Sequence, residues 1–420
     1  NISRQLWWGH RLPVWYSDSD DEIVISIEDP SNTPGHENKT FTQDQDTLDT
    51  WFSSALWPFS TLGWPEKTPE YEYFYPTNVL VTGYDIIFFW VIRMVFSALE
   101  QTGKLPFKDV FLNGLVRDDQ GRKMSKSLGN GIDPLDIIRD YGADALRFTL
   151  VTGNTPGNDM RFYIKRVEAN RNFANKLWNA TRFLMMNMSD EITDSNFDVE
   201  KLHYEDKWIL SKLQKVIKSI TEKIEKYDIG LAADDIYDFI WSDFCDWYIE
   251  IVKPVLYSDN HEEKTNTVKV LLYVLENILK LLHPFMPYIT EEIWQALPNR
   301  EAALIVSKWP EYKEELVFEK EERATEYIEN AIREIRNARS EMNIENSKKS
   351  NTLVYTKDPE VKEIFEEMKG LLLSLGYSNS VEITDDEGRK NSENIAIVLD
   401  RAEIQLPLKE LVDFEKELKR

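Results

Sequence analysis

The sequence predicts an α/β domain, followed by an all-α helical bundle and a small α/β unit at the C-terminal end. Three observations support this order. Two β-branched runs, 78–82 and 109–116, are each followed by a turn containing glycine and then by the start of a helix. Beyond residue 162 the apolar residues recur with a purely helical period. After residue 351 short strand-like runs return around one further helix.

The composition limits the class of protein. A chain of 420 residues can hold two or three domains, and a hydrophobic content of 42% is typical of a globular protein. The single cysteine, Cys245, excludes an internal disulfide and a cysteine-rich zinc site, fits a reducing compartment and is expected in the core. A net charge of −24 excludes a protein that coats nucleic acid unspecifically, although local basic patches could still bind RNA.

The sequence predicts no membrane span, no metal site and no leader. The apolar run 86–91 is interrupted by Arg93, far short of the roughly 20 residues that a span needs. His10 has no second ligand at a suitable spacing, so no protein-bound metal is predicted. The chain begins with Asn rather than Met and no charged-then-apolar leader follows, so we expect a piece of a longer protein.

The loop Gly121–Asn130 is the feature around which the first domain is organised. It places Lys123 and Lys126 three residues apart, with serines beside them and glycines around them. Lysine is a compact charge on a flexible stem, so such a pair can follow an anion whose charge shifts as a phosphoryl ester breaks. A solvated surface loop is the alternative. The position of the loop favours phosphate binding. The loop follows a strand and precedes a helix that Asp133 can cap and Pro134 can begin. Open α/β sheets bind their ligands at that end of the strands.

The loop sequence Lys123-Met124-Ser125-Lys126-Ser127 is identical to the KMSKS signature of class I aminoacyl-tRNA synthetases. The chain resembles this family over its whole length, and most closely its valyl branch, through DTWFSSALWP at 49–58, LLHPFMP at 281–287 and TEEIW at 290–294. The resemblance implies the C-terminal half of a Rossmann-like catalytic domain over 1–160 and an anticodon-binding bundle over 161–345. It also implies a small α/β subdomain over 346–410 and the start of a coiled-coil arm over 411–420.

The resemblance also implies which residues bind ATP. Lys126, aided by Lys123, would be catalytic, because it would neutralise charge on the pyrophosphate leaving group of ATP bound with Mg²⁺. The backbone of Leu115 and Val116 would meet adenine. The full implied set is Thr82 and Gly83 at the ribose, Leu115, Val116, and the loop residues Lys123, Met124, Ser125, Lys126 and Ser127.

The segment after Gly83 predicts an amino-acid pocket. Asp85 stands at a helix start, and Ile86 and Trp90 fall one turn apart, so they can line one apolar pocket beneath that carboxylate. A helix as apolar as this one is expected to be buried. The alternative is that Asp85 only caps the helix and Trp90 only packs. The resemblance favours the pocket, adds Trp51 to its border and implies valine as the amino acid.

Beyond a linker over 154–162, helical periodicity predicts helices over 166–188, 205–227, 231–252, 265–282, 288–296 and 321–342. Strands are predicted over 352–356, 381–384, 395–399 and 403–406, around a helix over 359–374. In the last bundle helix Arg333, Arg336 and Arg339 are spaced by three. They predict a basic ridge, the best candidate for contact with tRNA phosphates, with plain solvation as the alternative.

The resemblance thus implies a cytoplasmic, monomeric ligase that joins valine to tRNA(Val) through a valyl-adenylate made from ATP. An isoleucyl- or leucyl-type synthetase and a tRNA-binding module stay open as alternatives. The His-x-Gly-His motif of class I catalytic domains and the editing insertion are missing from the sequence. We therefore expect that this chain can neither proofread nor activate valine unaided.

Overall fold

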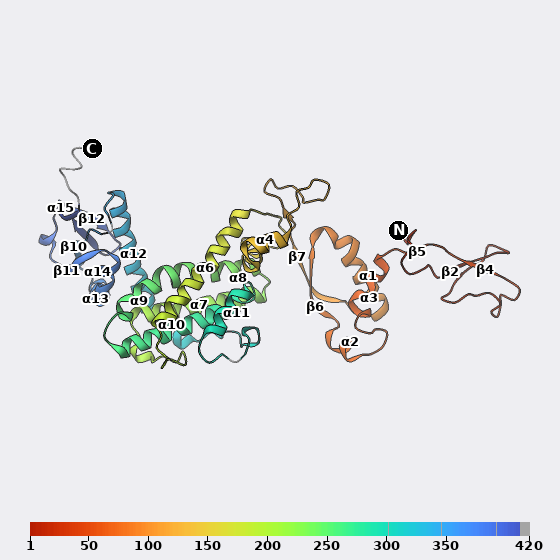
Figure 1. The fold of residues 1–420 in the computed structure, drawn as a ribbon, viewed down its shortest axis with the longest axis horizontal. Coiled ribbons are helices and arrows are strands. Elements are labelled where there is room, and N and C mark those ends of the chain that lie inside the picture. The colour runs from red at the N-terminus through yellow and green to blue at the C-terminus, as the bar shows by residue number, and fades with distance from the viewer. Residues whose placement is uncertain (301, 346, 392, 412–420) are drawn as a thin grey trace. The chain divides into compact units, whose positions relative to one another are not determined.

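The computed structural model describes residues 1–300, 302–345, 347–391 and 393–411. These residues form two compact units (Figure 1): one comprises Asn1–Arg117 and Thr155–Met160, and the other comprises 118–154 and the chain from 161 onward. Within the described ranges, no helix is long and apolar enough to cross a membrane. The predicted arm over 411–420 lies outside the described residues, apart from Leu411.

The first unit is built on two parallel strands, β6 (Thr77–Gly83) and β7 (Phe107–Asn113), close to the predicted runs. The connection between them passes through α3 (Ile92–Thr102), on which α1 (Trp51–Ser60) packs. Gly83 is paired with Asn113. The carboxyl ends of both strands therefore lie side by side, at the edge where open α/β sheets bind ligands (Figure 1).

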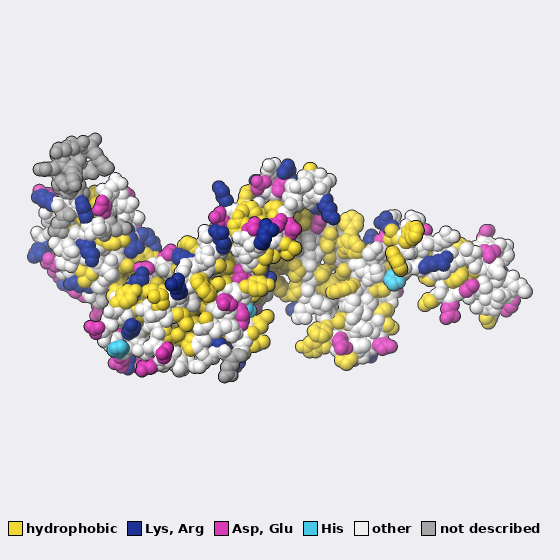
Figure 2. Space-filling view, viewed as in Figure 1, with side chains coloured by type: hydrophobic (Ala, Val, Ile, Leu, Met, Phe, Trp, Pro, Cys, Tyr) yellow, Lys and Arg dark blue, Asp and Glu magenta, His cyan; other side chains and the backbone are white. Residues whose placement is uncertain are grey.

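The segment directly after β6 differs from its prediction. A 3₁₀ turn (Tyr84–Ile86) and a π-helix (Ile87–Val91) precede α3, where one α-helix was expected. The prediction that this apolar segment is buried is wrong, because Phe88 is 80% and Phe89 is 62% exposed while Val91 is buried. The π-helix packs on α1 and runs on into α3, and this leaves Phe88 and Phe89 at the surface. Figure 2 accordingly shows hydrophobic side chains at the surface around β6.

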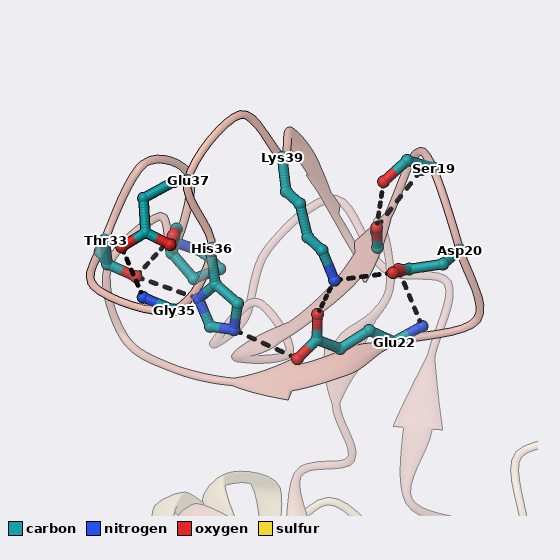
Figure 3. Close-up of polar contacts among 10 residues, drawn as sticks. Ser19, Asp20, Glu22, Thr33, Gly35, His36, Glu37 and Lys39 are labelled. Carbon is teal, nitrogen blue, oxygen red and sulfur yellow. Dashed lines mark hydrogen bonds and ion pairs between the residues drawn. The ribbon is translucent and has the colours of Figure 1, made fainter.

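A polar cluster ties together two loops of the N-terminal hairpin region (Figure 3). The Lys39 ammonium lies 2.7 Å from carboxylate oxygens of both Asp20 and Glu22, and His36 Nε2 lies 3.2 Å from Glu22. The hydrogen bond from Lys39 is the main reason that the pKa of Asp20 falls to about 2. The cluster stands beside an antiparallel sheet of β2 (Val14–Ser17), β3 (Ile23–Ile25) and β4 (Phe41–Gln43).

The second unit is dominated by a helical bundle whose core contains Phe173, Trp208 and Leu275, all fully buried. Cys245 is buried among them, as predicted. The predicted helix over 231–252 is interrupted by a π-helical stretch, η4. The bundle elements are α6 (Ile164–Asn187), α7 (Tyr204–Glu225), α8 (Ile229–Asp238), η4 (Phe239–Tyr248), α9 (Ile249–Leu256), α10 (His261–Leu282), α11 (Pro287–Ala296) and α12 (Glu319–Glu341).

The C-terminal part of this unit is a four-stranded sheet in the order β11-β10-β13-β12, with only the β10–β11 pair parallel. The predicted helix over 359–374 is broken at Met368 into two. The predicted fold class, a partial α/β domain followed by a helical bundle and a small α/β unit, is confirmed. The elements are β10 (Ser350–Tyr355), α13 (Pro359–Glu367), α14 (Lys369–Leu375), β11 (Ser378–Thr384), β12 (Asn394–Val398), β13 (Glu403–Pro407) and α15 (Leu408–Leu411).

The predicted basic ridge on α12 is not formed. Arg339 is 2% exposed and donates to the backbone carbonyls of Glu345 and Lys348. Arg336 donates to the carbonyl of Leu375 at 3.2 Å, and only Arg333 of the three is exposed. Residues three apart on an α-helix are separated by about 300°, which is about 60° short of a full turn. The three arginines therefore turn step by step from the solvent-exposed face of α12 toward its packed face. Basic and acidic side chains are interspersed on the face in Figure 2.

Candidate functional site

The KMSKS loop is anchored by a carboxylate at its start. Asp118 is buried, and one of its oxygens accepts the amide N–H of Arg122 at 2.7 Å. Its other oxygen accepts from Arg122 Nε at 2.7 Å and from Asn130 Nδ2 at 2.9 Å. These contacts, with the Asn130 amide as the largest cause, lower the pKa of Asp118 to about 2. The two ends of the loop are therefore tied together through one ionised group.

The loop itself has an inner and an outer side. Asn130 Oδ1 accepts the amide N–H of Ser125 at 3.0 Å, and Met124 packs against the core cluster that includes Ile137 and Val167. Lys123 and Lys126 are exposed. The loop is thus presented with its two lysines toward solvent, as expected of a loop that binds phosphates. We did not foresee Asp118 or Asn130, since a lone polar residue beside a loop has no periodic signal.

The helix after the loop begins as predicted. Asp133 accepts the amide N–H of Leu135 at 2.9 Å, and Pro134 takes the first position of α4 (Pro134–Tyr141). A cap and an initial proline stabilise a helix start, because they satisfy or remove amide donors that lack intrahelical partners. The C-terminal end of the loop is therefore fixed in place. Helix α5 (Ala143–Val151) follows.

Asn130→Ala is expected to loosen the loop. The change removes the amide that bridges Asp118 and Ser125, so the segment between them should open more often. We expect trypsin to cleave after Arg122 and Lys126 several-fold faster than in the wild type. Asn172→Ala, an exposed amide on α6, is the matched control and should leave the rate unchanged. Equal cleavage rates in wild type and Asn130→Ala would contradict this account of the loop.

Gly83, Asp85 and Leu115, all predicted for ATP or valine, lie close together near the end of β6. A Cβ on Gly83 would lie 2.9 Å from Asp85 Oδ1 and 3.8 Å from Leu115 Cδ2, so a side chain at position 83 would press on both. Thr82 is buried, and its hydroxyl donates to the carbonyl of Gly83 at 3.3 Å. Glycine at position 83 therefore allows the Asp85 carboxylate and the Leu115 side chain to lie close to the end of β6.

The predicted adenine contact needs one refinement. The amide N–H of Leu115 already donates to Asp159 Oδ1 at 2.8 Å, and its carbonyl accepts from Met160 at 3.0 Å. The Leu115 N–H and carbonyl are thus both engaged within the protein, so the predicted adenine contact of the Leu115–Val116 segment would use groups other than these two.

The predicted valine-binding residues lie on or near α1 and α3. Trp51 donates from Nε1 to the Asn1 carbonyl at 2.8 Å, and the Arg93 guanidinium lies 4.6 Å from the centre of its ring. Ile86 is 39% and Trp90 36% exposed, so both are open to a ligand. A single pocket formed by these residues with Asp85 stays a prediction. So does its convergence with Lys126, which belongs to the second unit.

The chain is similar to known proteins over most of its length. Residues 1–163 match the family described as tRNA synthetases class I (I, L, M and V). Residues 206–354 match the anticodon-binding domain of tRNA ligase. The chain belongs to the class I tRNA synthetases. It is 51% identical over 419 residues to the valine–tRNA ligase of Clostridium acetobutylicum, and 46% identical over 421 residues to that of Staphylococcus carnosus. Each match covers 100% of this chain and 47% of the relative, so the chain spans about half the length of these curated relatives.

Solved structures share the fold. A ternary complex of LeuRS from Agrobacterium radiobacter with tRNA and LeuAMS has a TM-score of 0.56 at 21% identity, covering 76% of this chain and 42% of that one. Mycobacterium tuberculosis methionyl-tRNA synthetase in complex with methionyl-adenylate has a TM-score of 0.54 at 21% identity, covering 70% of this chain and 53% of that one. At this level of identity the likeness concerns the fold alone.

Proposed function

We propose that the full-length protein joins valine to tRNA(Val) in two steps. Valine first attacks ATP to form valyl-adenylate, and the acyl group then passes to the terminal ribose of the tRNA. The observation that carries the proposal is the 51% identity to a valine–tRNA ligase over 100% of this chain. We further propose that the protein acts as a monomer in the cytoplasm.

In the first step a carboxylate oxygen of valine attacks the α-phosphorus of ATP, and the bond to the β-phosphate breaks. Negative charge then builds up on the departing pyrophosphate, which leaves with the Mg²⁺ that entered as part of the substrate. Lys126, aided by Lys123, stabilises that charge more strongly in the transition state than in the ground state, as catalysis requires. The exposure of Lys126 on an anchored loop supports this role.

For the amino acid, we propose that the Asp85 carboxylate binds the valine ammonium. Ile86 and Trp90 then contact the branched side chain, with Trp51 at the border. In such an apolar pocket one methylene is worth only about 1–3 kcal/mol, so we expect valine and isoleucine to differ by about 10- to 200-fold in kcat/KM. We propose that the helical bundle binds tRNA, with Arg333 as the exposed residue that remains of the predicted ridge.

The proposal is tested by ATP–pyrophosphate exchange with the full-length protein and valine, isoleucine or leucine. We expect the highest kcat/KM with valine. Preference for isoleucine or leucine would overturn the choice of amino acid. If no amino acid supports exchange while intact tRNA still gives a salt-dependent gel shift, the protein is an RNA-binding module and the ligase proposal is wrong.

A further inference from the structure

We infer that Asp159 is a positioning residue for ATP in the first step. This inference rests on the proposed function, since it concerns the same site. Asp159 lies in the short segment Thr155–Met160, by which the chain returns to the first unit after the KMSKS loop and helices α4 and α5. No periodic pattern or motif marks it in the sequence.

Asp159 connects three points around the carboxyl ends of the two strands. Its Oδ1 accepts the amide N–H of Leu115, just beyond β7, at 2.8 Å. Its Oδ2 accepts from Arg117 Nε at 2.5 Å and from the hydroxyl of Tyr84, the residue after Gly83, at 3.3 Å. The Leu115 amide and then Arg117 are the main groups that lower the pKa of Asp159, so the carboxylate is ionised at neutral pH.

The segment around Asp159 is fitted closely to the chain beyond β7. The amide N–H of Gly157 donates to the carbonyl of Leu112 at 2.8 Å. A Cβ on Gly114 would lie 1.7 Å from the carbonyl oxygen of Asn158, so glycine is required there for the two backbones to meet. Asp159 therefore lies in a segment whose backbone packs directly against the chain at the end of β7. Its Arg117 partner is only 30% exposed and Asp159 itself 21%, so solvent screens the ion pair less than it screens a fully exposed pair.

Two consequences for ATP follow from this geometry. Leu115 and Val116 form the segment expected at adenine, and Asp159 fixes the direction of that segment through the Leu115 amide. Arg117 is the last residue of the first unit before Asp118, where the KMSKS loop is anchored. Asp159 therefore holds both the adenine segment and the point from which the phosphate-binding loop departs. A small displacement of either would misplace ATP, and misplacement by about 1 Å can cost up to 100-fold in rate.

The test is the kinetics of ATP–pyrophosphate exchange by Asp159→Asn in the full-length protein. The amide keeps an oxygen for Leu115 but loses the charge that holds Arg117. We expect KM for ATP to rise about tenfold, with KM for valine within a factor of two. Asp159→Glu should recover part of the loss, since it restores the charge. Arg117→Gln should raise KM for ATP in the same way, and the double variant should be no worse than either single one.

Asp136→Asn serves as the matched control, because Asp136 also pairs with an arginine, Arg139, but on the exposed face of α4. Its kinetics should equal those of the wild type. The inference is overturned if Asp159→Asn has the wild-type KM for ATP. It is also overturned if KM for valine and ATP change alike with a lowered melting temperature, which would indicate a purely structural residue. Absence of valine-dependent exchange in the wild type would instead refute the proposed function.

Discussion

Lys126→Ala in the full-length protein is expected to slow valine-dependent ATP–pyrophosphate exchange by about 100- to 1,000-fold. The loss should fall on kcat, because the lysine is proposed to act on charge that develops on the leaving pyrophosphate. Lys126 is exposed on a loop tied at both ends, so its removal should leave the fold intact. Steady-state kinetics at several ATP concentrations, with a thermal melt of each variant, provide the measurement.

Lys165→Ala is the matched control for this change. Lys165 is an exposed lysine in the first turn of α6, outside the proposed site. Its exchange rate should equal that of the wild type. A kcat for Lys126→Ala within threefold of the wild-type value would show that the KMSKS loop does not stabilise the transition state.

Glu329→Gln is expected to change how the stability of the helical bundle depends on pH. Glu329 lies on α12 with 8% of its surface exposed, and its Oε1 is buried with no hydrogen-bond partner in the described part of the chain. Burial, followed by the nearby charge of Asp243, raises its pKa to about 8, although Lys212 and Arg333 oppose the shift and Glu326 adds to it. The carboxyl group is therefore largely protonated in the folded protein at neutral pH.

The sign of the effect follows from the raised pKa. A carboxyl that titrates near 8 when folded and near 4.5 when unfolded favours folding below pH 4.5, and this stability is lost as pH rises toward 8. Glutamine does not titrate. The free energy of unfolding of Glu329→Gln, minus that of the wild type, should therefore rise by about 2–4 kcal/mol between pH 5 and pH 8.

Urea denaturation at both pH values measures this difference. The control is Glu341→Gln, at an exposed position near the end of the same helix, which should shift by no more than about 0.5 kcal/mol. If Glu329→Gln and the wild type respond to pH alike, the buried carboxyl is not the source of the pH dependence.

The local elements of this fold could be predicted from the sequence. The apolar period of 166–188 predicted α6, and Asp133 with Pro134 predicted the start of α4, because periodicity and capping depend on neighbouring residues only. The loop that carries Lys123 and Lys126 was also predicted, since serines and glycines surround the lysines in the sequence itself.

Contacts between distant parts of the chain could not be predicted. Arg339 was expected in solvent, yet the residues that follow α12 fold back and bury it. Asp118 meets Asn130 from 12 residues away, and Asp159 meets Leu115 from 44 residues away. Isolated polar residues such as these have no period, so only the folded backbone reveals their partners. The π-helix over 87–91, with Phe88 and Phe89 exposed, also escaped prediction, because its composition is that of a buried helix.

The most direct test of the central claim is a structure of the full-length protein with valine and a non-hydrolysable ATP analogue. We expect the Asp85 carboxylate at the valine ammonium, the backbone of Gly83 at the ribose, and Lys126 Nζ within about 3.5 Å of a phosphate oxygen. A structure with the nucleotide elsewhere, or with Lys126 on the opposite side of the sheet from Gly83, Asp85 and Trp90, would contradict the proposed site.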